Sequence, residues 1–272
     1  MYKNIKTLYF SATGTTEKIV CSIANEILKL TNVNEITENI DFTLPKARNK
    51  QVSFVAEDLV VIGIPVIAGR VPNVLLNYLK TIKGNGALAV AVVVYGNRNY
   101  DDALIELKDI LETDGFQVIA GGAFIGEHSF SNVLAKNRPD EKDLSIAKKF
   151  AVKIYDKIMN KNEIHSLVVK GNKPYRDYYR PKDKNNIAVD IRKITPKTNL
   201  ACDDCKLCVS ICPMGSIDFI DVSKLNGICI KCCACIKKCP RQAKYFDDAN
   251  FLNHKKELEI QFESRREPEL FI

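Results

Sequence analysis

The feature that most constrains this chain is a cysteine pattern that occurs twice. Cysteines spaced C-x2-C-x2-C-x3-C and followed by proline run from Cys202 to Pro213, and the same spacing returns 27 positions later, from Cys229 to Pro240. Nine of the ten cysteines lie between residues 202 and 239. Three thiolates two residues apart can surround one metal centre only if the backbone turns tightly, and the proline redirects the chain because it fixes φ and lacks a donor. The stretch therefore predicts a small unit built around metal ligands.

Two other uses of cysteine have to be weighed against iron–sulfur clusters. Zinc sites usually have two C-x2-C pairs with a longer gap, not three cysteines in series. A disulfide framework is typical of short secreted chains, whereas this chain has 272 residues and concentrates its cysteines in one stretch. A doubled motif is also far more specific than a single one. The pattern favours iron–sulfur clusters.

The run is similar to that of bacterial ferredoxins, and this resemblance implies two [4Fe–4S] clusters in which the fourth cysteine of each copy binds the other cluster. The implied ligands of one cluster are Cys202, Cys205, Cys208 and Cys239, and those of the other are Cys229, Cys232, Cys235 and Cys212. Cys233 and Cys21 are expected to be packing residues.

The first 165 residues alternate apolar, strand-like runs with helical patterns. Strands are expected near residues 5–10, 33–40, 59–64, 86–95 and 116–124. Helices are expected up to about Leu30, over 73–80, from a cap at Asp101 to Gly115, and over 140–159. This alternation predicts an α/β domain with a parallel sheet and helices on both faces. Ligands of such sheets bind beyond the carboxyl ends of the strands, where three loops (11–16, 65–72 and 95–101) should gather.

The loop 11–16 follows the first strand, is rich in hydroxyl groups, and leads into a helix. A helix N-terminus offers backbone N–H groups to a phosphate. The loop lacks both the Gly-Lys-Ser/Thr of a nucleoside-triphosphate loop and the G-x-G-x-x-G of a dinucleotide site. It suits a mononucleotide such as FMN, although serine and threonine are also ordinary helix caps.

The pattern Ser11-x-Thr13-Gly14-x-Thr16 resembles the FMN-phosphate loop of flavodoxins, and the likeness covers about residues 1–160. With the ferredoxin repeat, the chain resembles the flavodoxin–ferredoxin fusion proteins of anaerobic bacteria and archaea. The resemblance implies a flavodoxin-like, doubly wound, five-stranded parallel sheet of order 2-1-3-4-5, plus a small α+β ferredoxin domain.

The flavodoxin resemblance also implies roles for single residues. The phosphate would be held by Ser11, Thr13, Gly14, Thr15 and Thr16. The flavin ring would meet the backbone of Pro65, Val66, Ala68 and Gly69 and be flanked by Tyr95, Gly96, Asn97 and Tyr100. Because the chain has no tryptophan, Tyr100 is the aromatic expected to stack on the ring, or else to pack against its own helix start. Arg70 is expected to be a solvated loop arginine.

The expected organisation is a flavodoxin-like FMN domain at 1–165, a linker at 166–190, a ferredoxin domain at 191–248 and a tail at 249–272 that packs on one of the domains. The linker is rich in tyrosine and arginine, which favours packing across the domain joint over stacking on RNA. Leu258, Ile260 and Phe262 alternate in the tail, which we interpret as a strap.

The net charge of +7 divides unevenly. Residues 1–165 carry 20 basic and 19 acidic side chains, and residues 166–272 carry 20 and 14, so the excess of +6 lies in the cysteine half. Two oxidised clusters with their thiolates contribute about −2 each and a flavin phosphate about −2. The basic residues are therefore interpreted as cluster counter-charge and solvated surface, not as a nucleic-acid face. No apolar run reaches the ~18 residues of a membrane span, and the cysteine usage favours a reducing cytoplasm.

Together these features favour an electron-transfer protein that uses FMN and two [4Fe–4S] clusters and exchanges electrons with redox partner proteins. One alternative is an FMN-dependent reductase of a small organic substrate, fed by the ferredoxin domain. Another is a redox-sensing or scaffold protein with structural clusters. No nucleophile–base pair or carboxylate pair indicates hydrolysis, and the sequence leaves open whether the chain forms a homodimer.

Overall fold

The structure is a computed structural model, and it describes residues 2–31, 38–160, 166–182 and 187–272. The elements up to the end of the first region are β1 (Asn4–Tyr9), α1 (Thr15–Lys29), β2 (Glu38–Asp41), a 3-10 helix (Pro45–Asn49), β3 (Asp58–Pro65), α2 (Asn73–Leu79), β4 (Leu88–Tyr95), α3 (Ala103–Thr113), β5 (Gln117–Ile125) and α4 (Glu141–Met159). The remaining elements are β6 (Lys197–Thr198), α5 (Leu207–Ser210), α6 (Ala234–Lys237), β7 (Lys244–Tyr245), α7 (Ala249–Gln261) and β8 (Glu269–Phe271).

The main sheet has the strand order β2-β1-β3-β4-β5-β8. Its first five strands are parallel and follow the flavodoxin-like order 2-1-3-4-5, which confirms the expected fold class. β8 adds a sixth strand that pairs antiparallel with β5, from Gly121 opposite Phe271 to Ala123 opposite Glu269. The expectation of five strands was thus one strand short, because a three-residue strand in the tail leaves no periodic pattern.

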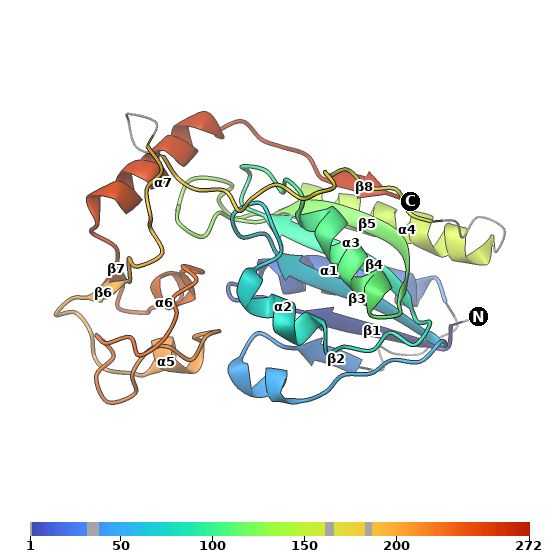
Figure 1. Cartoon of the computed structure of the whole chain (residues 1–272), viewed down its shortest axis with the longest axis horizontal. Helices are drawn as coiled ribbons and strands as arrows, with labels where there is room; N and C mark the ends of the chain where they lie inside the picture. The colour runs from blue at the N-terminus through green and yellow to red at the C-terminus, as the bar shows by residue number, and fades with distance from the viewer. Residues whose placement is uncertain (1, 32–37, 161–165, 183–186) are drawn as a thin grey trace.

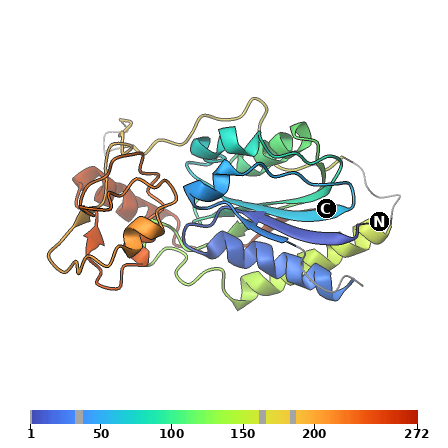
Figure 2. The same cartoon turned by 90° about the horizontal axis from the view of Figure 1, so that it is seen from below.

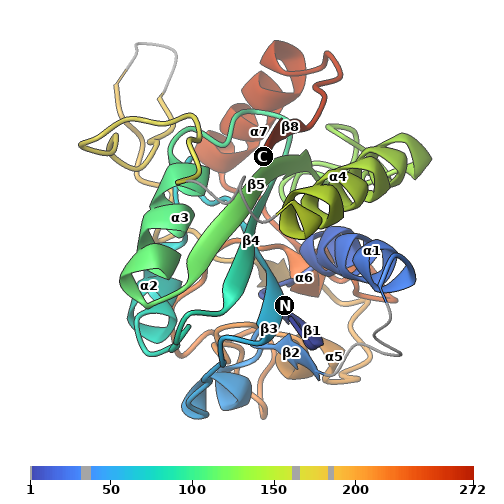
Figure 3. The same ribbon diagram turned by 90° about the vertical axis from the view of Figure 1, so that its right-hand side faces the viewer.

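The helices cover both faces of the sheet, as Figure 3 shows with α2 and α3 on one side and α1 and α4 on the other. α1 buries the stripe Ile19, Ile23 and Ile27, which recurs at helical spacing. α4 begins at a capping box in which Asp140 and Asp143 each accept a backbone N–H from the other. β3 and β4 are buried along almost their whole length, as strands covered on both faces are.

Three expectations about local structure either differ from the structure or lie partly outside the described residues. The helix after the third loop is preceded at its N-cap by Asp102, not by Asp101, whose φ of 44° is left-handed. The tail segment in which Leu258, Ile260 and Phe262 alternate is helical up to Gln261, and the tail packs on the main sheet through β8. Of the strand expected over 33–40, residues 33–37 lie outside the described residues, and β2 occupies Glu38–Asp41.

The cysteine region lies beyond one end of the main sheet (Figures 1 and 2). It contains the short helices α5 and α6 and the two-stranded sheet β6–β7. α7 then leads the chain back to the main sheet, where β8 lies beside β5 (Figure 1). In the part of the chain that the structure describes, no helix is both long and apolar enough to cross a membrane.

Candidate functional site

The loop after β1 has the geometry of an anion site. Residues 11–15 are half-buried, and Thr16 is buried in the first turn of α1. Gly14 precedes the helix at a left-handed φ of 92°, and a Cβ built there would meet no atom within 4 Å. A side chain at Gly14 would therefore be strained by the backbone, and the space in front of the helix is open.

The backbone amides of residues 12–16 donate no hydrogen bond to any other described residue. The next two N–H groups are used, since Glu17 N–H donates to Ser11 Oγ (3.1 Å) and Lys18 N–H donates to Gly14 O (3.1 Å). Ser11 N–H donates to Thr43 Oγ1 (2.8 Å), which ties this loop to the end of β2. A run of unpartnered amides at the N-terminus of a 15-residue helix fits a phosphate group.

The second loop leaves β3 at the same edge. Val66 N–H donates to Val94 O (2.8 Å) at the end of β4, and the loop closes in a tight turn between Ile67 and Arg70. Ala68 and Gly69 have left-handed φ values of 53° and 78° in this turn. Pro65, Val66 and Ala68 are half-buried, so they remain open to a ligand, whereas Gly69 is buried.

Arg70 is not the solvated residue that was expected. Its guanidinium forms a two-pronged ion pair with Glu106 (Nε–Oε2 2.7 Å, Nη2–Oε1 2.8 Å) and lies over the rings of Tyr175 and Tyr178. The pKa of Arg70 is raised, first by the hydrogen bond to Glu106. Arg70 thus fixes the segment around Tyr175 against α3.

The third loop is held by the tail. Tyr100 is buried and its Oη donates to Glu269 Oε2 (3.1 Å), and burial, together with Glu269, raises the pKa of Tyr100. Asn97, 2% exposed, donates from Nδ2 to Phe262 O (2.6 Å) and Ser264 O (3.0 Å). Tyr95 is buried against Tyr100, with 5.6 Å between the ring centroids. Of the four residues expected to flank the ring, the structure leaves only Gly96 half-buried at this edge and places the three side chains in the core.

Two aromatic side chains that were not predicted as site residues do lie at this edge. Tyr179 N–H donates to Ala68 O (2.8 Å) in the second loop, and its ring lies under the guanidinium of Arg98 from the third loop, 4.4 Å from the centroid. His128 packs against Gly96 so closely that a Cβ there would meet His128 Cδ2 at 2.5 Å. Desolvation lowers the pKa of His128 to about 3. Only the position of Tyr179 in a tyrosine-rich linker could have pointed to it.

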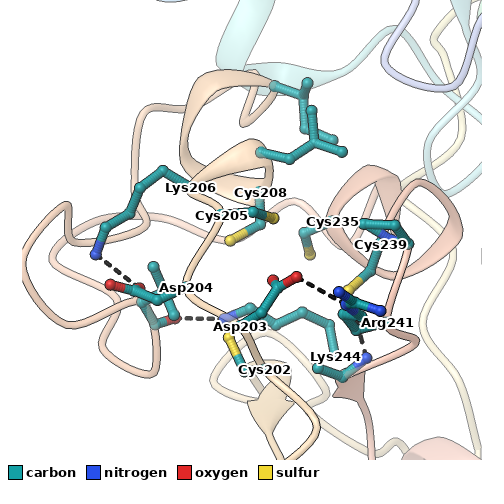
Figure 4. A pocket seen from close by; sticks show the side chains of 15 residues that line it. Cys202, Asp203, Asp204, Cys205, Lys206, Cys208, Cys235, Cys239, Arg241 and Lys244 are labelled. Carbon is teal, nitrogen blue, oxygen red and sulfur yellow. Dashed lines mark hydrogen bonds and ion pairs between the residues drawn. The ribbon is translucent and has the colours of Figure 1, made fainter.

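The first set of predicted cluster ligands lines one hollow, called the outer hollow below. Cys202, Cys205, Cys208 and Cys239 surround it together with Cys235, and it measures about 360 Å³, including the part open to solvent. Figure 4 shows the sulfur atoms placed around this space, with Asp203 bound to Arg241 at its rim. Cys202, Cys205, Cys208 and Cys239 are the set that the ferredoxin resemblance implied, with the fourth cysteine supplied by the other copy of the motif (the crossed arrangement).

The second set lines another hollow, called the inner hollow below. Cys212, Cys229, Cys232 and Cys235 border it, with Cys233 and Phe246, and it measures about 410 Å³, again including open space. Cys233 is buried and its Sγ donates to Lys231 O (3.4 Å), which is a packing role. Fourth cysteines therefore face the hollow of the other copy, on both sides.

The two copies have the same backbone conformation. Lys206 and Cys233, 27 positions apart, have φ values of 60° and 59° directly before α5 and α6. Ser216 N–H donates to Cys212 Sγ (3.4 Å), and Ala243 N–H donates to Cys239 Sγ (3.3 Å), again 27 positions apart. Hydrogen bonds of this kind favour the thiolate form of the sulfur.

The donor set fits a four-iron cluster in each hollow. All ten cysteines lie in the described part of the chain and none is joined in a disulfide. Among the described residues, no group of three or more His, Cys, Asp or Glu side chains converges as ligands of a single metal ion do. Desolvation raises the pKa of Cys232 and of Cys235 to about 12. These thiols would be neutral unless a cationic iron centre between them stabilised the thiolates.

The inner hollow lies against the carboxyl ends of the main sheet. Arg48, in the 3-10 helix after β2, donates from Nη2 to the carbonyl of Pro213 (2.6 Å), next to Cys212. Ile230 packs on the core of the sheet. Lys237 forms an ion pair with Glu127 after β5, and Phe251 of α7 contacts both Phe246 and Phe130 (4.1 and 4.8 Å between centroids).

Comparisons with solved structures return flavodoxins for the first region. An archaeal flavodoxin is 16% identical, covers 57% of this chain and 99% of its own, and has a TM-score of 0.36. Flavodoxin 2 from Bacillus cereus gives 16%, 57%, 99% and 0.41, and a mutant Fusobacterium nucleatum flavodoxin bound to flavin mononucleotide gives 16%, 58%, 98% and 0.38. Because these TM-scores are below 0.5, the fold assignment stands on the strand order of the sheet itself. No protein-family model matches the chain, and no curated protein does.

Proposed function

We propose that this chain is an electron-transfer protein that holds FMN at the carboxyl ends of β1, β3 and β4 and one [4Fe–4S] cluster in each cysteine hollow. FMN stores one or two electrons and each cluster stores one, so the protein converts between one-electron carriers and a two-electron flavin. The observation that supports this most directly is the position of the inner hollow, which lies against the same edge of the sheet as the unpartnered amides of residues 12–16.

Different loops would bind the phosphate and the ring of FMN. The amides of residues 12–16 and the hydroxyls of Ser11, Thr13 and Thr15 would hold the phosphate, with Gly14 leaving room in front of the helix. The backbone of Pro65, Val66 and Ala68 and of Gly96 would border the ring. Tyr179, beside Ala68, replaces Tyr100 as the aromatic candidate.

The outer hollow is the side that faces a protein partner. Cys205 is exposed there. Phe219 and Ile220, 67% and 88% exposed, lie beside Lys206, which lines this hollow. We therefore expect a redox partner protein to exchange electrons at the outer cluster. Because cluster ligands must stay reduced to bind iron, we place the protein in the cytoplasm.

The test uses anaerobically purified protein. Iron, acid-labile sulfide and FMN are measured per chain, followed by a stepwise optical and EPR redox titration. We expect about eight iron atoms and one FMN, all reversibly reducible, as two four-iron clusters and one flavin require.

Four outcomes would contradict the proposal in different ways. Iron near eight with no FMN after reconstitution would overturn the flavin site and leave the clusters standing. Zinc in place of iron would overturn both hollows as cluster sites. Clusters that cannot be reduced reversibly would favour a structural role, and turnover with a small organic molecule would favour the reductase.

A further inference from the structure

Each cysteine hollow contains one buried lysine. Lys231 lines the inner hollow and is 7% exposed, and Lys244 lines the outer hollow and is 3% exposed. Lys231 Nζ donates to the carbonyls of Arg192 (2.9 Å) and Cys229 (3.3 Å), and Lys244 Nζ donates to the carbonyl of Val222. In the described part of the chain, neither ammonium forms an ion pair with a carboxylate.

The other basic residues around the outer hollow behave differently. Lys206 is paired with Asp204 (2.7 Å) and Arg241 with Asp203 (2.7 Å). These two pairs are near the surface and neutralise themselves. Lys231 and Lys244 also line the hollows, but their positive charges are not paired with a carboxylate in the described part of the chain.

A buried ammonium without a counter-charge is costly, and backbone carbonyls satisfy its hydrogen bonds but not its net charge. Both lysines line a hollow that is also lined by cysteines. Four thiolates around an oxidised [4Fe–4S] centre carry a net charge of about −2. An anionic group of this kind in each hollow would balance the ammonium beside it.

The internal repeat shows that the fold does not require these lysines. Counting back 27 positions, Lys231 corresponds to Asp204, which has the same left-handed backbone (φ 54° and 56°). Lys244 corresponds to Ile217. The same backbone thus accepts an aspartate and an isoleucine, and the second copy supplies the buried lysine of both hollows.

We propose, on the basis of the iron–sulfur content proposed above, that Lys231 and Lys244 set the reduction potentials of the inner and outer clusters separately. A fixed positive charge near a group that gains an electron stabilises the reduced form. Each lysine lines one hollow only, so its removal lowers the potential of that cluster more than that of the other, even though the charge of Lys244 also reaches Cys235 of the inner set.

The experiment compares reduction potentials in anaerobic EPR and optical titrations of the full chain. Lys244→Ile installs the residue that the first copy has at this position. Lys231→Met keeps a side chain of similar length without the charge. Each variant is expected to lower the reduction potential of one cluster by ~59 mV, which is a tenfold change in the equilibrium constant of a one-electron couple. The two variants are expected to affect different clusters. Arg241→Gln, which removes a paired and exposed charge from the wall of the outer hollow, is the matched control and should leave both potentials in place.

Lys244→Arg and Lys231→Arg separate charge from shape. Loss of about four irons in Lys244→Ile with full iron in Lys244→Arg also supports the proposal, because the charge is then needed to hold the cluster. Full iron with unshifted potentials, a shift of the same cluster by both variants, or equal iron loss in the isoleucine and arginine variants would overturn it. The cluster potentials are read whether or not FMN is bound, so failure of the flavin assignment gives a different result from failure of this proposal.

Discussion

The inner and outer hollows are built from the same motif but meet different surroundings. Both have four cysteines in the crossed arrangement and one buried lysine. The inner hollow is covered by the main sheet, through Arg48 at Pro213 and through Ile230. The outer hollow is rimmed by exposed ion pairs such as Asp203–Arg241. The difference suggests that one copy of the motif joins the two regions of the protein and the other faces solvent and partners.

The largest expected effect compares one cysteine from each hollow. Cys232→Ala and Cys205→Ala should each reduce the iron content from the proposed eight or so to about four, because each removes one proposed ligand of one cluster. Only Cys232→Ala should also lower the melting temperature of the main sheet, since the inner hollow packs on that sheet. Iron analysis and thermal unfolding followed by far-UV circular dichroism measure both. Equal destabilisation by the two variants would remove the distinction between the hollows.

The next effect tests the contact between inner hollow and sheet. Arg48 donates to the carbonyls of Phe42 (2.9 Å), Thr43 (2.6 Å) and Pro213 (2.6 Å). Arg48→Gln should lower the free energy of unfolding by about 3 kcal/mol, because charge-assisted hydrogen bonds are lost and carbonyls lose their donor. The measurement is denaturant unfolding, with Arg241→Gln at the outer rim as control. A larger loss in the control than in Arg48→Gln would contradict the comparison.

The smallest expected effect is a pH dependence of the free energy of unfolding, caused by His128. His128 faces Lys237, His254 and Arg98, and its folded-state pKa of about 3 lies below the usual 6.5. The unfolded chain therefore binds this proton more readily, so stability is complete above pH 6.5 and declines as the pH falls toward 3. Between about pH 7.5 and 5.5 the loss should be about 1 kcal/mol.

His128→Asn removes this titration and keeps an acceptor for the N–H of Phe130, which now donates to His128 Nδ1 (3.1 Å). The variant should therefore unfold with a smaller pH dependence, while the contribution of His254, whose pKa is also lowered by burial, stays. Denaturant unfolding at several pH values measures the slope. An unchanged slope in the variant would show that His128 does not titrate on unfolding.

What the sequence predicted well was everything with a strong period or spacing. Continuous apolar runs identified β3 and β4, and the repeat predicted two sets of four cysteines, each of which lines its own hollow. Nothing local showed that Tyr100 would be covered by Glu269, because the two residues are 169 positions apart. The burial of Lys231 and Lys244 was not predicted from the sequence, since a lysine side chain is usually solvated. Only the comparison with Asp204 and Ile217 in the first copy sets them apart.

The pairing of β8 with β5 makes the cysteine region an insertion within a single sheet. After α4 the chain runs along the α/β region as far as Tyr179, builds the cysteine region, and returns through α7 to the open side of β5. A domain joined to its neighbour at both ends cannot swing away as one on a single tether can, so the two halves of the molecule stay at high effective concentration. The return strand also covers a sheet edge that would otherwise be a template for pairing with other chains. Because β8 is synthesised after both cysteine copies, that edge is protected only once the sequence of the cysteine region has been made.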